Sequence, residues 1–332
     1  MSTNPAKSTP RPVHPILALA GLTAGLGAIL VVLLALFILP SLKSGPHDLT
    51  IGLVGSPQDV TLMEENLAAL LPGAYRVQTY PSAESLSSAI VRREVVGGYI
   101  ALENGVEALI ASAGSTAISG TLSASASALA QTMGLPAQVK DVVPLPPNDP
   151  SGIGIGGLTF PLVFGGIVPV VAFKSVFPRR NGWRLTGIAL TSLASGLIVA
   201  AVLQFWFGSI TDALWPVTAA MALGIAGMAL PLAGLQNVFG GKGFTIGAMA
   251  MMFLGNPLAG TATTGAWLPN GLGFFGQLLP PGATGTLVRS AAYFDWAGGG
   301  AATLTLALWI AAGAALTAIG VMRDRAIPLP EE

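Results

Sequence analysis

The chain of 332 residues contains no cysteine and only two histidines, His14 and His47. The absence of cysteine excludes disulfide bonds, thiolate metal sites and cysteine nucleophiles. The two histidines lie at opposite ends of one apolar run, so they cannot share a metal ion. No Ser/His/Asp arrangement and no complete phosphate-binding loop is found either. We therefore predict that the protein is not an enzyme and has no cofactor and no metal site.

Charge is the second scarce property of this sequence. Lys, Arg, Asp and Glu make up 9% of the residues, whereas a soluble domain has about 25%. The formal net charge is zero, and without a basic stripe we expect no nucleic-acid partner. The hydrophobic share of 52% instead indicates an integral membrane protein, with the lipid bilayer as its first partner.

The chain contains long apolar runs without charged residues. Each is long enough to cross a bilayer as a helix, because ~20 helical residues cover the ~30 Å of a hydrocarbon core. We predict a polytopic α-helical membrane protein with six transmembrane helices. The predicted spans are residues 16–40, 152–173, 185–207, 214–235, 244–258 and 297–322. The first is interpreted as an uncleaved signal anchor, since its apolar run is too long for a signal peptide. The other five form a membrane domain over residues 152–322.

The signs of the charges between these runs predict the orientation. With the N-terminus inside, the inner segments carry nine of the fifteen basic residues and three of the fifteen acidic ones. We therefore expect a multi-pass protein of the cytoplasmic membrane with both termini in the cytoplasm. The tails are residues 1–15, rich in proline and expected to be disordered, and 323–332. Residues 47–150 then lie outside the cell.

The outer segment 47–150 is long enough for one small domain. Its apolar runs and turn residues predict strands at 49–54, 75–80, 95–102, 107–113 and 138–145, and helices at 58–71, 84–93 and 116–133. Ser56 followed by Pro57 marks a helix start, and the turn 103–105 favours a hairpin. The order βαβαββαβ predicts a small extracytoplasmic α/β domain between the first and second membrane helices.

None of the six predicted spans has an ionisable residue at its centre. Ion-driven carriers usually keep such a group in spite of a cost of ~2.5–3.5 kcal/mol, so any transport would need another energy source. The glycines of 152–157 match the spacing G-x-G-x-x-G, but they open a membrane span and no acid follows ~20 residues on. We interpret them as a flexible entry to the membrane.

The loop 260–296 is the most specific stretch. It is too apolar for a free external loop and too rich in Gly and Pro for a helix. Such a backbone is tolerated at membrane depth only when it is buried in protein or lines a water-filled cavity. We predict a re-entrant or interfacial segment on the outer leaflet, with an aromatic belt at the headgroups as the alternative. An ion pair between Arg289 and Asp295 would fix this loop.

The shortest span ends at Gly255-Asn256-Pro257, a weak helix terminator beside this loop. Together with the entry to the second span, this junction is the candidate gate. The candidate gate residues are Asp149, Pro150, Gly152, Gly255, Asn256, Pro257, Pro280, Pro281, Gly282, Arg289 and Asp295.

Four short motifs carry a family resemblance. They are DVVPL at 141–145, DPSG at 149–152, LGNPL at 254–258, and LPPG at 279–282 continuing through Arg289 to Tyr293-Phe294. In these motifs and in its layout the chain resembles the ABC type-2 permease superfamily, and it is most similar to the YhgE/Pip (phage-infection protein) group of Gram-positive membrane proteins.

The resemblance implies a permease-like homodimer in the plasma membrane of a bacterium, served by a separate ATP-binding subunit. Export or handling of an apolar or amphipathic envelope molecule is the function it suggests. The cytoplasmic loop 174–184 is short and contains Pro178 and Gly182, which leaves little room for a helix that couples to an ATPase. The alternative is a non-transporting envelope protein whose outer domain binds a partner, of the phage-receptor or secretion-accessory type.

Overall fold

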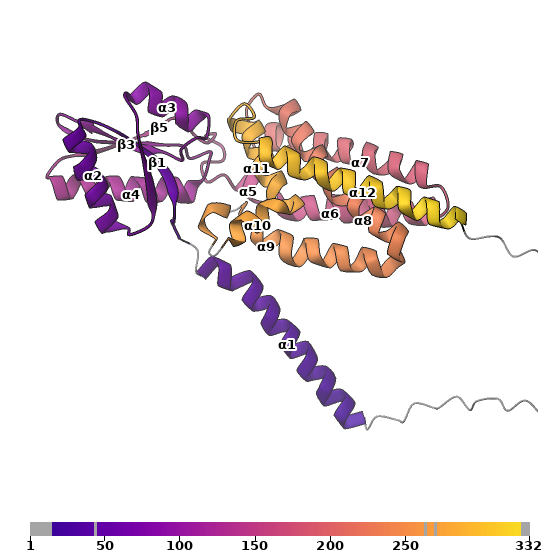
Figure 1. Cartoon of the computed structure of the whole chain (residues 1–332). Coiled ribbons are helices and arrows are strands. Elements are labelled where there is room, and N and C mark those ends of the chain that lie inside the picture. The colour runs from indigo at the N-terminus through magenta and orange to yellow at the C-terminus, as the bar shows by residue number, and fades with distance from the viewer. Residues whose placement is uncertain (1–14, 43–44, 262–263, 269–270, 327–332) are drawn as a thin grey trace, which may run out of the picture.

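The computed structural model describes residues 15–42, 45–261, 264–268 and 271–326. The two predicted tails therefore lie outside the described residues, apart from Pro15 and 323–326. Within the described ranges, five helical stretches are long and apolar enough to cross a membrane: Pro15–Ala35, Ile153–Val176, Asn181–Trp206, Leu214–Leu258 and Gly300–Arg323. The chain is a multi-pass helical membrane protein with a small α/β unit at one end (Figure 1).

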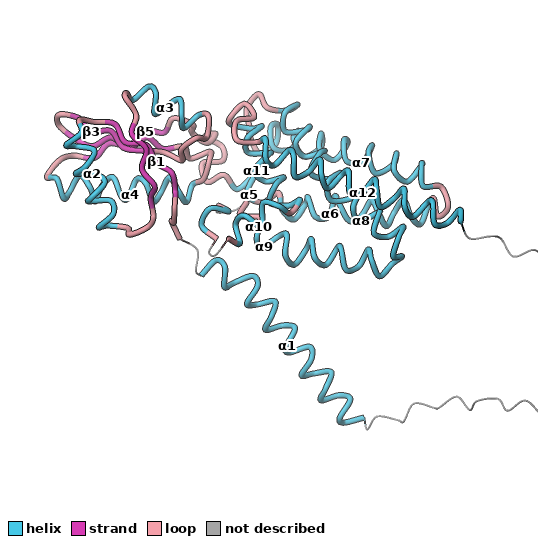
Figure 2. Tube along the Cα trace, viewed as in Figure 1, coloured by secondary structure: helices cyan, strands magenta, loops and turns pink. Residues whose placement is uncertain are grey.

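The strands gather in one five-stranded sheet (Figure 2). They are β1 (Leu49–Val54), β2 (Tyr75–Thr79), β3 (Gly98–Leu102), β4 (Gly105–Ile110) and β5 (Ala137–Asp141). The sheet order is β2-β1-β3-β4-β5, with β3 and β4 as an antiparallel hairpin and the other neighbours parallel. Its helices are α2 (Pro57–Leu70), α3 (Ala83–Val91) and α4 (Thr116–Met133), so strands and helices follow the order that the sequence predicts.

Local signals explain where these helices begin. Ser56 caps α2 in a capping box with Asp59, and Pro57 occupies the first turn, where its missing N–H leaves no hydrogen bond unmade. Ser82 caps α3 in the same way. The sheet then buries both of its faces, one with α2 and α4 and the other with α3.

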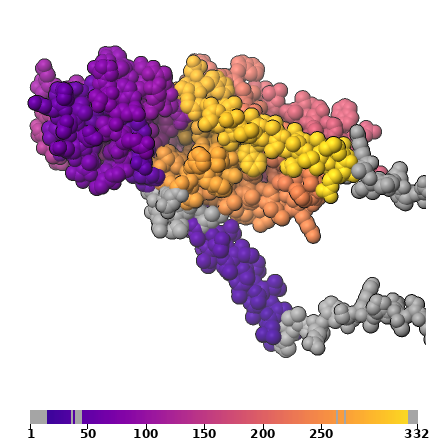
Figure 3. Space-filling model, in the orientation of Figure 1, coloured from indigo at the N-terminus to yellow at the C-terminus, as the bar shows by residue number. Residues whose placement is uncertain are grey.

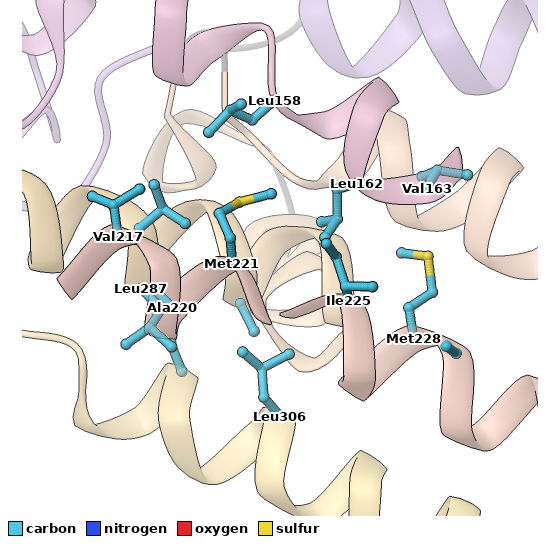
Figure 4. Packing of buried hydrophobic residues seen from close by; sticks show 14 of the residues in the cluster. Leu158, Leu162, Val163, Val217, Ala220, Met221, Ile225, Met228, Leu287 and Leu306 are labelled. Carbon is cyan, nitrogen blue, oxygen red and sulfur yellow. The ribbon is translucent and has the colours of Figure 1, made fainter. Parts of the chain in front are cut away.

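The membrane part is built around the long helix α8 (Leu214–Ala250), which packs against α6, α7, α11 and α12. Its buried Met221, Ile225 and Met228 meet Leu162 of α6 and Leu306 of α12 (Figure 4). The surrounding elements are α1 (Pro15–Leu42), α5 (Ile153–Gly156), α6 (Thr159–Val176), α7 (Asn181–Ala201), the π-helical turns η1 (Val202–Trp206) and η2 (Met251–Gly255), α9 (Asn256–Leu258), the 3-10 turn η3 (Gly265–Trp267), α10 (Leu272–Leu278), α11 (Pro280–Tyr293) and α12 (Gly300–Ala326).

The number of long apolar helices is five where the sequence predicts six, because the predicted spans 214–235 and 244–258 belong to one helical stretch. That stretch is interrupted at Gly240, whose φ of 65° and ψ of −155° are not helical and suit glycine. A Cβ added at Gly247 would lie 2.7 Å from Cδ1 of Leu235. Residues twelve apart in a straight helix are ~18 Å apart, so the chain reverses at Gly240.

The segment 260–296 is not free of helix, as its composition suggested; it contains α10 and α11. Pro280 and Pro281 lie in the first turn of α11, where proline is compatible with a helix. Most residues of α11 are buried, and an added Cβ at Gly276 or Gly282 would overlap a neighbouring carbonyl oxygen. Glycine therefore serves close helix packing here, and the expectation that this composition excludes a helix is wrong.

Candidate functional site

The α/β unit meets the membrane helices at the end of α11. Nη1 of Arg93, just after α3, donates a hydrogen bond of 2.6 Å to Oγ of Ser290. The same guanidinium lies 5.1 Å from the ring centroid of Phe294, a favourable cation–π distance. Phe294 is 3% exposed and packs into the core beneath α3 with Leu86 and Ile90. The end of α11 is thus part of the core of the α/β unit.

Arg93 has a backbone conformation that glycine usually supplies. Its φ is 58°, and it directly follows Arg92, the C-cap of α3, at the position where helices commonly end in a left-handed glycine. A left-handed residue with a side chain costs about 1–2 kcal/mol. Strain of this kind is typical of residues with a particular task, and here the side chain reaches α11.

Arg93 shares a cavity with Arg289 of α11. This basic cavity has a volume of about 450 Å³, and its polar lining consists of Arg93, Thr261, Thr264, Gln277, Thr286, Arg289 and Thr305. Both arginines are half-buried, and Nη2 of Arg289 donates to the carbonyl of Thr261 at 2.9 Å. The pKa of Arg93 is lowered to about 10, first by burial and then by the positive charge of Arg289.

Among the described residues, no carboxylate forms an ion pair with either arginine: the ion pairs there are Arg76–Asp48 and Arg92–Glu94, both on the surface. The described residues that line the basic cavity include no Asp or Glu. A buried or half-buried cation without a counter-ion is unfavourable, so the cavity is suited to an anion.

A second cavity lies where α5, α6 and α7 approach one another. This apolar cavity has a volume of about 740 Å³. It is lined by Asn148, Asp149, Ile153, Gly154, Gly157, Leu158, Pro161, Ile198, Val199, Val202, Leu203, Trp206, Phe207 and Ser209. Its polar groups come from the loops before α5 and after η1, whereas its walls are aliphatic and aromatic.

Asp149 lies at the polar end of the apolar cavity. Its Oδ1 and Oδ2 accept hydrogen bonds of 2.8 Å from the N–H groups of Ile153 and Gly154. The carboxylate is 8% exposed and is held by the start of α5, which favours a negative charge. Gly152 precedes α5 with a φ of 66°, and Pro150 is exposed.

The predicted gate motifs around 255 and 281 lie in contact. A Cβ at Gly255 would be 2.7 Å from Cγ of Pro281, and Asn256 and Pro257 continue the chain as the half-buried start of α9. Pro280, Pro281 and Gly282 form the buried first turn of α11. These residues are packing elements and line neither cavity.

The predicted pairing of Arg289 with Asp295 is wrong. Asp295 is exposed and has a φ of 45°, whereas Arg289 points into the basic cavity and bonds the carbonyl of Thr261. Arg93, which faces Arg289, was not among the predicted residues. Its sequence neighbours give no sign of the contact, since Ser290 lies 197 residues further along the chain.

Comparison with protein-family models, with curated proteins and with solved structures finds no match in any of the three.

Proposed function

We propose that the protein is a permease-like, non-enzymatic membrane protein that exports or handles an apolar or amphipathic envelope molecule. The apolar cavity carries this proposal. Its volume of about 740 Å³ falls within the ~300–1,000 Å³ of small-molecule sites. Its aliphatic walls suit a hydrocarbon part, and Asn148, Asp149 and Ser209 at one end suit a polar head.

We count the two arms of α8 as separate crossings, which makes six with α1. Arg184, in the first turn of α7, donates to Oδ1 of Asn237 at 2.7 Å and Oε1 of Gln236 at 2.8 Å. This contact supports placing the turn at Gly240 on the same membrane face as the loop 177–180. Arg179, Arg180 and Lys242 then lie together on the inside, with the α/β unit outside at the opposite end (Figure 1).

The energy source in this proposal is a separate ATP-binding subunit, with a homodimer as the transporting unit, as the resemblance to the YhgE/Pip group suggests. Within the described spans, charged side chains lie near helix ends or next to the Gly240 turn: Lys174, Arg184, Lys242 and Arg323. A proton or sodium gradient has no ionisable group to act on at mid-membrane in this part of the chain.

The proposal is tested by filling the apolar cavity. Val202→Trp places a large side chain at its wall, and Leu190→Trp makes the same change on α7 at a lipid-facing position that is 63% exposed. Lipid analysis of cells lacking the protein should show an envelope amphiphile in altered amount. Val202→Trp should reproduce that change and Leu190→Trp should not. No altered molecule in the deletion strain, together with no ATP-binding subunit in pull-downs, contradicts the proposal.

The second candidate is a non-transporting envelope protein whose outer domain binds a partner. The edge strand β5 favours it, because Ala137, Gln138, Val139 and Lys140 are all exposed and an open edge can pair with another strand. Val139→Lys should then abolish a cross-linked partner and the phenotype. Under the permease proposal it should leave both the phenotype and the lipid profile unchanged.

A further inference from the structure

We propose that the basic cavity and a groove on α12 together form a binding site for an anionic lipid of the outer leaflet. The phosphate of the headgroup lies between Arg93 and Arg289, and one acyl chain follows the groove. The site would be separate from the apolar cavity, with which it shares no lining residue in the described part of the chain. The lipid would thus connect the outer unit to the membrane helices, whatever the apolar cavity takes up.

At the headgroup end of the site, Arg93 and Arg289 have more hydrogen-bond donors than their protein partners take up. Each guanidinium has five N–H groups in a planar fork. Among the described residues, the side chain of Arg93 donates to Ser290, and the side chain of Arg289 donates to the carbonyl of Thr261. Each guanidinium therefore has further N–H donors for a shared ligand. The two cations come from different parts of the fold and repel each other. A phosphate between them would replace this repulsion with two charge-assisted contacts.

At the acyl-chain end of the site, a groove on α12 continues the basic cavity. Leu278 and Thr305 line both spaces. Beyond them the groove, about 280 Å³ in volume, follows Leu308, Trp309 and Ala312. The α12 residues of the groove, 305, 308, 309 and 312, follow the pattern i, i+3, i+4, i+7 and so form one helix face. Nε1 of Trp309 donates to the carbonyl of Leu278 at 2.8 Å, which holds the ring as a wall of the groove.

The depth of the groove fits an outer-leaflet chain. Residues 305–312 lie ~8–18 Å along α12 from Gly300 at its outer end, at 1.5 Å per residue, while half of a bilayer core is ~15 Å. Leu308 is 61% exposed, so the groove opens towards lipid. In Figure 3 the yellow surface of α12 lies beside the orange surface of the preceding segment.

The experiment is native mass spectrometry of the full-length protein in detergent, titrated with phosphatidylglycerol and, separately, with zwitterionic phosphatidylcholine. We expect phosphatidylglycerol to bind at least tenfold more tightly. Arg93→Gln and Arg289→Gln should each weaken it about tenfold, as expected for charge-assisted contacts. Arg92→Gln is the matched control: Arg92 is exposed and paired with Glu94, and its change should leave affinity within twofold. Equal binding of both lipids, or unaltered binding to Arg93→Gln and Arg289→Gln, overturns the proposal.

A second pair of measurements separates a lipid from a free anion and does not depend on the arginines. Ala312→Trp fills the groove from an exposed position and should weaken phosphatidylglycerol at least tenfold. Inorganic phosphate at millimolar concentration should fail to displace the lipid. If phosphate displaces it fully and Ala312→Trp has no effect, the site belongs to a free anion and the lipid proposal is wrong. Lipid analysis of Val202→Trp cells is independent of all these results.

Discussion

Arg93 Nη1 donates a 2.6 Å hydrogen bond to Oγ of Ser290, and so joins the end of α3 in the α/β unit to α11 of the membrane part. Ser290 is fully buried, and Leu287 and Val288 on the same helix belong to the membrane core. The next turn ends at Phe294, in the core of the α/β unit. Because α11 is part of two cores, a displacement of the α/β unit must also move α11.

Removing the Arg93 side chain should loosen this connection. Arg93→Ala loses a hydrogen bond from a charged group, worth about 1.5–3 kcal/mol, and a cation–π contact worth about 0.5–1 kcal/mol. We expect faster hydrogen exchange in residues 83–97 and 288–297, measured by mass spectrometry. Arg92→Ala should change little, because its ion pair with Glu94 lies on the surface, where water screens the two charges.

Arg93→Gly separates backbone strain from side-chain contacts. Glycine relieves a left-handed conformation that costs about 1–2 kcal/mol, so Arg93→Gly should be more stable than Arg93→Ala by about that amount. It should exchange as fast as Arg93→Ala in residues 288–297, since both variants lack the contact with Ser290. Equal exchange in Arg93→Gly and the unmodified protein would show that the contact does not hold α11.

Close packing of the segment 255–282 predicts a strong dependence on glycine. A Cβ at Gly276 would overlap the carbonyl oxygen of Leu258, so Gly276→Ala should destabilise the protein by about 1–3 kcal/mol or more. Gly300 has open space around its added Cβ, and Gly300→Ala should be neutral. Denaturant unfolding in detergent micelles checks both. A neutral Gly276→Ala would mean that α9 and α10 are less closely packed.

The sequence was sufficient to predict those elements whose formation depends on one dominant physical effect. The cost of burying charge marks the long apolar helices, and Ser56 and Ser82 begin the helices expected after them. The sequence was not sufficient to predict α11. Pro280 and Pro281 break a helix in its interior but occupy the first turn here. The packing of the glycines depends on residues from other helices, which the local sequence does not show. Arg93 was missed because its contacts lie in a distant segment, and no local pattern encodes them.

The absence of native cysteine makes the proposed orientation directly testable. Gly120, Ser175 and Gly241 are exposed, and each can be changed to cysteine in turn. A membrane-impermeant maleimide should label Gly120→Cys in intact cells. It should label Ser175→Cys and Gly241→Cys only after permeabilisation, because both positions are proposed to face the cytoplasm. Labelling of Gly241→Cys from outside would contradict a return crossing by the second arm of α8.

Arg184 should tolerate no replacement, not even by lysine. It is 2% exposed, and its guanidinium donates to Oδ1 of Asn181, Oδ1 of Asn237 and Oε1 of Gln236 at 2.7–2.9 Å. A lysine lacks the planar fork that reaches all three, so Arg184→Lys should lower the free energy of unfolding by about 1–3 kcal/mol. Arg180→Lys, at an exposed position, is the control and should have no effect on denaturant unfolding.

The charge state of Arg93 predicts how lipid binding depends on pH. Its pKa of about 10 in the folded protein is below that of an arginine in the unfolded chain. Between these two pKa values the unfolded state binds more protons, so stability rises with pH there. Below pH 9 the side chain stays charged, and phosphatidylglycerol affinity should be constant from pH 6 to pH 8.5.

Arg93→His should make that affinity depend on pH. An ordinary histidine pKa is about 6.5, and burial and the facing charge of Arg289 should lower it further. The nearby Arg92 and Glu94 form their own pair and are the same in both proteins. Affinity should therefore be low at pH 8 and recover towards pH 5.5. A variant that binds equally at both values would show that the positive charge at this position does not hold the headgroup.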